Sequence, residues 1–141
     1  MEQKNINDEK SLPILFTEFK YRHELFWKLY FRFMLSILTL FVLNFLYPSY
    51  INDEIISISH ELIQIVFTFA ILITGIIATF IAIKEYQFIL SVLNPYQEIL
   101  KRNEIFDESA IKMKNFYILF CWTPVIISIL FSLIIVINIF G

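Results

Sequence analysis

The sequence is poor in glycine, cysteine and charged residues. Its 141 residues include two glycines and one cysteine, and 17% are charged, against about 25% in typical soluble proteins. So few glycines exclude a glycine-rich phosphate-binding loop, and a single cysteine excludes an intramolecular disulfide. The net charge of −2 argues against nucleic-acid binding, which usually requires a basic excess. We therefore expect no nucleic-acid partner.

Charge is missing mainly from three apolar windows, which is typical of a membrane protein. Residues 62–83 contain no Asp, Glu, Lys or Arg, and a helix of about 20 apolar residues crosses the hydrocarbon core of a bilayer. Residues 33–51 and 116–140 are also uncharged. The sequence therefore predicts an all-α, polytopic membrane protein with three transmembrane helices plus cytosolic amphipathic helices.

Small side chains recur four residues apart in the central span. Ala70, Thr74, Ala78 and Ala82 form one ridge of the predicted helix, and Gly75 lies beside it. Small residues allow transmembrane helices to pack closely. This small-residue ridge either packs against the other spans of the same chain or forms the contact between identical subunits. Because three helices alone make a poorly buried bundle, we expect a homo-oligomer.

The segments outside the spans are also predicted to be largely helical. Residues 1–10 are polar and are expected to be disordered. A cytosolic amphipathic helix is predicted over residues 11–32, beginning at Ser11. Residues 84–115 are predicted to form a cytosolic helical hairpin with a break at Asn94–Pro95. Residues 11–141 then form a single membrane domain.

Lys and Arg are distributed unevenly around the spans. Six precede the first span, none lies in the connector 52–61, and five lie within residues 84–115. The positive-inside rule therefore places the N-terminus and residues 84–115 in the cytoplasm, and the C-terminus outside. We expect a multi-pass protein of the cell inner membrane, surrounded by lipid.

Residues suited to catalysis or metal binding are scarce. His23 lies on the apolar stripe of the N-terminal helix, where it is a hydrogen-bonded packing histidine or, alternatively, a ligand or a pH sensor. His60 is predicted on the opposite side of the membrane, so the two histidines cannot share a metal within one subunit. Cys121 lies in an apolar run, which is more typical of a small buried side chain than of a redox or metal site. We expect no enzyme activity and no catalytic, metal or cofactor site.

Uncharged polar side chains occur in all three spans. They either hydrogen-bond within and between helices, or some of them line a narrow pore formed by several subunits. The absence of charge at mid-membrane argues against a secondary transporter. These side chains are Ser36, Thr39, Asn44, Thr68, Thr74, Thr79, Thr123, Ser128, Ser132 and Asn138.

Residues 21–32, YRHELFWKLYFR, form a basic and aromatic helix that leads into the first span. A very short outer connector and a second span prolonged as a cytosolic helix follow it. Over about residues 20–105 this layout resembles the SLATT-type small membrane effectors of bacterial antiphage defence. The resemblance implies a protein that oligomerises or opens on a cytosolic partner or nucleotide signal and permeabilises the inner membrane. The third span is an addition to the two that these families typically have.

Two hypotheses of function follow. The first is an oligomeric pore-forming or membrane-disrupting effector in antiphage or abortive-infection defence. In this hypothesis His23, Lys28 and Arg32 receive the signal, and the helix that continues from Tyr86 passes it to the small-residue ridge. The alternative is a non-conducting structural subunit or adaptor that anchors a larger membrane complex or a cytosolic partner.

Overall fold

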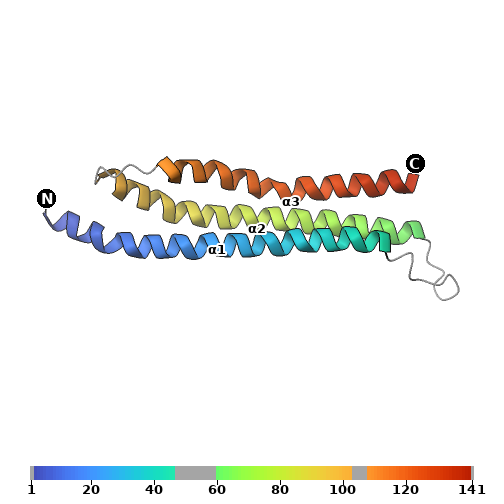
Figure 1. Cartoon of the computed structure of the whole chain (residues 1–141), viewed down its shortest axis with the longest axis horizontal. Helices are drawn as coiled ribbons and strands as arrows, with labels where there is room; N and C mark the ends of the chain where they lie inside the picture. Colours follow the sequence, from blue (N-terminus) through green and yellow to red (C-terminus); the bar gives the residue numbers. More distant parts are fainter. Residues whose placement is uncertain (1, 47–59, 103–107, 141) are drawn as a thin grey trace. The chain divides into compact units, whose positions relative to one another are not determined.

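The computed structural model describes the backbone of residues 2–46, 60–102 and 108–140, and the side chains within residues 11–46, 61–102 and 115–139. All of this backbone is helical. Figure 1 shows the three helices, which are α1 (Glu2–Leu46), α2 (His60–Arg102) and α3 (Glu108–Phe140). The prediction of an all-α chain is therefore confirmed. The end of the first span beyond residue 46 and residues 52–59 of the connector lie outside the described residues.

Each helix contains a segment long and apolar enough to cross a membrane. These segments are Ser11–Leu46, Glu61–Arg102 and Asn115–Ile139. A residue advances an α-helix by about 1.5 Å, so each segment exceeds the roughly 30 Å of a hydrocarbon core. In length and composition, three predicted spans are confirmed.

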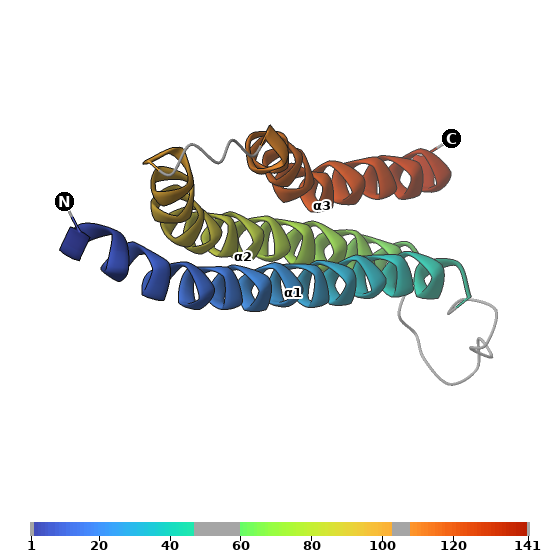
Figure 2. The same cartoon turned by 60° about the vertical axis from the view of Figure 1, so that its left-hand side comes forward.

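The helix bounds differ from the sequence-based expectation in two places. α1 begins at Glu2 and contains Pro13, so the segment expected to be disordered is helical and Ser11 does not start the helix. α2 continues through Pro95 to Arg102, so no break occurs at Asn94–Pro95. Proline removes one backbone hydrogen bond, but buried Leu93 and Ile99 anchor α2 on either side of it. Figure 2 shows α2 bending in these last turns.

The chain forms two compact units, and segments of all three helices contribute to each. Unit 1 comprises Met1–Leu29 and Ile81–Cys121, and unit 2 comprises Tyr30–Phe80 and Trp122–Gly141. The charged residues of the described helices fall almost entirely in unit 1. Residues 33–46, 62–80 and 122–139 of unit 2 contain no Asp, Glu, Lys or Arg.

An aromatic core holds unit 1 together. Phe26, Ala82, Ile89, Tyr117 and Cys121 are buried in it and come from all three helices. The rings of Phe26 and Tyr117 meet edge to face, with centroids 5.0 Å apart. Such a ring pair stabilises a core by about 0.5–1.5 kcal/mol beyond the burial of its area.

Unit 2 has an aliphatic core with much less aromatic content. Ile37, Ile71 and Ile135, one from each helix, are buried in it. Beside them the rings of Phe41 and Phe131 stack with centroids 4.0 Å apart. These contacts bring the unit 2 segments of α1, α2 and α3 together.

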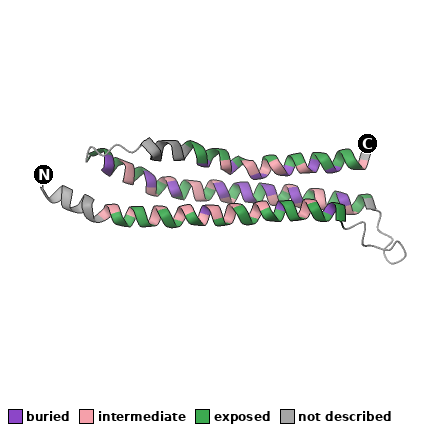
Figure 3. Ribbon diagram, in the orientation of Figure 1, coloured by how far each residue is buried: buried purple, intermediate pink, exposed green. Residues whose placement is uncertain are grey.

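Large apolar side chains cover the outside of unit 2. Figure 3 shows exposed residues recurring along the helices, interspersed with buried positions on α2. In water so large an apolar surface would favour aggregation, whereas a surface of this kind is expected for helices in contact with lipid. In the unit 2 segment of α2 the exposed large apolar residues are Leu62, Ile65, Val66, Phe69, Ile73, Ile76, Ile77 and Phe80.

Gly75 marks a close approach of α2 to α3 in unit 2. A Cβ atom at position 75 would lie 2.6 Å from Cβ of Ser128 and 3.1 Å from the carbonyl oxygen of Pro124. A separation under 3.0 Å between carbon atoms is not tolerated, and rotating the Ser128 hydroxyl does not relieve it. Only glycine therefore fits at position 75 with the helices at this distance.

We expect Gly75→Ala to destabilise the protein. The added methyl group overpacks the α2–α3 contact, which typically costs about 1–3 kcal/mol, less the gain of up to about 1 kcal/mol in helix propensity. Unfolding in mixed detergent micelles measures the effect. Adding Ser128→Gly removes the obstructing side chain and should restore much of the loss. Wild-type stability of the single variant would contradict the close approach.

Candidate functional site

A hydrogen bond between His23 and Tyr117 joins α1 to α3 inside unit 1. It links Nδ1 of His23 with the hydroxyl of Tyr117. The two rings meet edge to face, with centroids 5.9 Å apart, and the ring of Trp27 meets His23 similarly at 6.3 Å. His23 therefore lies within the packed aromatic core and is bonded to a side chain 94 residues further along the chain.

Arg22 joins α1 to α2 in the same unit. Its Nη1 lies 3.7 Å from Oε2 of Glu85, and its Nε donates to Oε1 of Glu18 at 3.0 Å. The guanidinium also lies over the ring of Phe88, 4.9 Å from the centroid. The Glu85 side chain is only 15% exposed, and its Oε2 accepts no hydrogen bond from the described residues. Among the described side chains, the long ion pair to Arg22 is therefore the interaction that offsets the cost of burying the Glu85 carboxylate.

The three residues expected to receive a signal lie in different environments. His23 is half-buried in the unit 1 core, whereas Lys28 and Arg32 are exposed. Sequence reasoning gave no site role to Arg22, Glu85 or Tyr117. The spacing of Glu18 and Arg22 along one helix was the available signal for part of this network, but nothing local marks the partners on α2 and α3.

The small-residue ridge is buried largely within the chain. Ala78 and Ala82 are 2% and 7% exposed, and Ala82 belongs to the unit 1 core. Gly75 faces α3 at the close approach described above. Thr74 is half-buried, and its hydroxyl donates to the carbonyl of Ala70 at 2.7 Å. In this conformation the buried members of the ridge, Ala78 and Ala82, pack inside one chain.

Apart from Asn138, which is exposed, the polar side chains of the spans fall into two groups. In the first, hydroxyl groups of Ser36, Thr39, Thr68 and Thr74 donate to the backbone carbonyl four residues earlier, at 2.7–2.9 Å. The bond between Tyr30 and Thr123, at 2.8 Å, similarly satisfies both hydroxyls. In these residues the polar groups form hydrogen bonds within and between helices, which is the first of the two roles that the sequence suggested for them.

The second group is buried in unit 2 without hydrogen-bond partners among the described residues. It consists of Asn44 and Ser128, both 0% exposed, and Thr79 and Ser132, both 6% exposed. An uncompensated polar group in a low-dielectric interior typically costs about 1–3 kcal/mol. Each of the three helices contributes at least one of these groups. Unit 2 is therefore apolar outside and partly polar inside.

The described residues offer few side chains for catalysis or metal binding. Within the described ranges, no three His, Cys, Asp or Glu side chains are placed to hold a metal ion. Cys121 is buried in the unit 1 core with a free thiol. The side chain of His60 lies outside the described residues.

We expect Tyr117→Phe to lower the free energy of unfolding by about 1 kcal/mol, because it removes the hydroxyl that bonds to His23 and keeps the ring. Detergent unfolding of the full chain measures this change. Tyr21→Phe is the matched control, since Tyr21 is 58% exposed, and it should change stability by less than about 0.5 kcal/mol. Equal effects of both substitutions would contradict a stabilising His23–Tyr117 bond.

Known proteins provide no match that could supplement these observations. No family model, no curated protein and no solved structure matches the chain. Inferences about function therefore depend on the side chains of the two units.

Proposed function

We propose that the protein is a pore-forming effector of the bacterial inner membrane that opens on a cytosolic signal and assembles with copies of itself. The observation that carries this proposal is the polar interior of unit 2. Asn44, Thr79, Ser128 and Ser132 are buried behind an apolar outer surface without hydrogen-bond partners among the described residues. Polar groups at membrane depth usually face a bundle interior or a water-filled cavity.

An open state would relieve this cost. If the unit 2 helices separate around water, the buried hydroxyl and amide groups gain hydrogen bonds that the closed state lacks. The free-energy gap between closed and open states is therefore smaller than for a fully apolar core, and a modest signal suffices to shift the population. Ser and Thr groups among Ile and Phe side chains are suited to a weakly polar, gated lumen.

Unit 1 is suited to receive the signal. Arg22–Glu85 ties α1 to α2, and His23–Tyr117 ties α1 to α3. A cytosolic ligand or partner that competes for Arg22 or His23 loosens these ties. Since α2 is one helix from His60 to Arg102, a movement at Glu85 is passed directly to Thr79 and Gly75. The resemblance of residues 20–105 to SLATT-type effectors supports a role in antiphage or abortive-infection defence.

The pore proposal is tested by membrane potential in cells that express the chain. We expect Arg22→Gln, which removes the ion pair to Glu85, to depolarise cells faster than wild type in a voltage-sensitive dye assay. Adding Thr79→Val should suppress that depolarisation, because it removes an interior hydroxyl without changing side-chain volume. Thr74→Val is the matched control, since the hydroxyl of Thr74 is already bonded to Ala70.

The outcomes separate the hypotheses. Depolarisation that Thr79→Val suppresses and Thr74→Val does not would support an interior pathway. Well-inserted Arg22→Gln protein that leaves the potential unchanged, also with its natural partner and trigger present, would contradict the pore and favour the non-conducting adaptor. The adaptor has one observation of its own: Ile14, Phe16 and Tyr21 of unit 1 are 70%, 52% and 58% exposed, which offers an apolar contact to a cytosolic partner.

Orientation is a further part of the proposal, and the distribution of Lys and Arg supports it. We expect a cytoplasmic N-terminus and an outside C-terminus. In a Cys121→Ser background, a cysteine at exposed Asn138 should react with a membrane-impermeant maleimide in intact spheroplasts. A cysteine at exposed Lys20 should react only after lysis. The reverse labelling pattern would overturn the orientation.

A further inference from the structure

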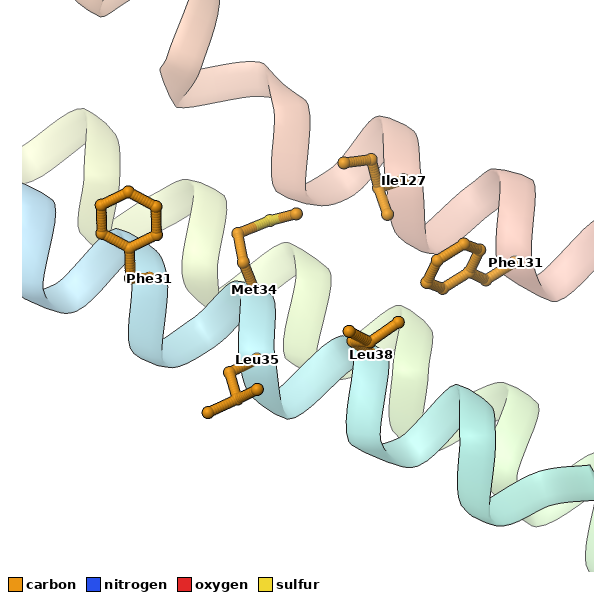
Figure 4. A pocket seen from close by; sticks show the side chains of 6 residues that line it. All are labelled: Phe31, Met34, Leu35, Leu38, Ile127 and Phe131. Atoms are coloured by element: carbon orange, nitrogen blue, oxygen red, sulfur yellow. The ribbon is translucent and has the colours of Figure 1, made fainter. Parts of the chain in front are cut away.

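An apolar groove lies between α1 and α3 on the outside of unit 2. Its volume is about 320 Å³, and it is lined by Phe31, Met34, Leu35, Leu38, Ile127 and Phe131. Figure 4 shows Ile127 and Phe131 extending from α3 toward Met34 and Leu38 on α1. Phe31, Leu35 and Leu38 are 63%, 64% and 47% exposed, so the groove is open to the medium that surrounds unit 2.

Contacts between α1 and α3 bound the groove along the helices. Toward the start of the unit 2 segment of α1, the hydroxyls of Tyr30 and Thr123 are 2.8 Å apart. Further along, the rings of Phe41 and Phe131 stack at 4.0 Å. Between these two contacts the helices leave a space about twice the 150 Å³ that accommodates benzene in a protein interior. An apolar space of this size suits a length of flexible hydrocarbon.

Arg32 is the charged residue that adjoins the groove lining along the sequence of α1. It is exposed, it follows the lining residue Phe31, and it lies on the same side of α1 as Leu35, three residues later. The ion pairs among the described side chains, Arg22–Glu18, Arg22–Glu85 and Arg102–Glu98, do not include Arg32. A guanidinium forms bidentate hydrogen bonds with phosphate oxygens, and long side chains on a helix extend toward its N-terminus.

We propose that this groove binds one acyl chain of an anionic phospholipid and that Arg32 binds its phosphate. The six lining side chains are all apolar, so they recognise the hydrocarbon. The Arg32 guanidinium, which forms no ion pair with the described side chains, recognises the headgroup. In the proposed orientation Arg32 lies toward the cytoplasmic end of the span, where anionic headgroups are found. The site does not require conduction, so its failure and that of the pore are distinguishable.

The full chain in detergent micelles tests this site by native mass spectrometry. It is titrated with phosphatidylglycerol or with phosphatidylcholine carrying the same acyl chains, and the first bound lipid is counted. We expect wild type to bind phosphatidylglycerol about five-fold more tightly, as one Arg near a headgroup predicts. Arg32→Gln should abolish this preference, and Leu38→Trp, which fills the groove, should weaken binding of both lipids.

Two controls make the result specific. Lys20→Gln removes an equal charge from an exposed position of unit 1 and should keep the preference. Leu130→Trp adds equal bulk at a residue of α3 that is 53% exposed and does not line the groove, and it should bind as wild type does. Equal affinity for the two lipids, a preference retained by Arg32→Gln, or unchanged binding by Leu38→Trp would each overturn the proposal.

Discussion

Helices surrounded by lipid gain nothing from burying one another's apolar side chains, since the tails outside are equally apolar. In the proposed membrane setting, close contact is therefore needed to hold unit 2 together, and the approach of α2 to α3 at Gly75 and Ser128 provides such a contact. That contact has a cost, because it buries the Ser128 hydroxyl without a partner among the described residues. The proposed opening depends on this balance between tight helix packing and buried polar groups without hydrogen-bond partners.

Unit 1 is held together differently. Its core is aromatic, and ionic and hydrogen-bonded ties cross from α1 to both other helices through Arg22 and His23. In the proposed mechanism these ties would respond to a charged ligand, whereas the van der Waals contact in unit 2 would respond to movement of a helix. α2 is continuous through both units.

The sequence predicted the helices well, because uncharged runs and helical periodicity are local properties. It predicted less of the sites, because those depend on partners far apart in the chain. Tyr117 lies in an apolar window with nothing to mark it as the partner of His23. Pro95 shows the converse error, since buried side chains on both sides outweigh its local preference to end a helix. Similarly, sequence alone did not distinguish Thr79 from Thr74, although only the latter is satisfied by its own helix.

The close approach at Gly75 also constrains how this protein can evolve. A side chain gained at position 75 collides with Ser128, so the two positions are not free to change independently. The first step toward a larger residue on α2 is a loss at position 128, which also removes one of the unsatisfied hydroxyls. Along that path the close contact is rebuilt with other side chains while the polar interior diminishes. Retention of both Gly75 and Ser128 would therefore preserve the close helix contact and the buried hydroxyl together.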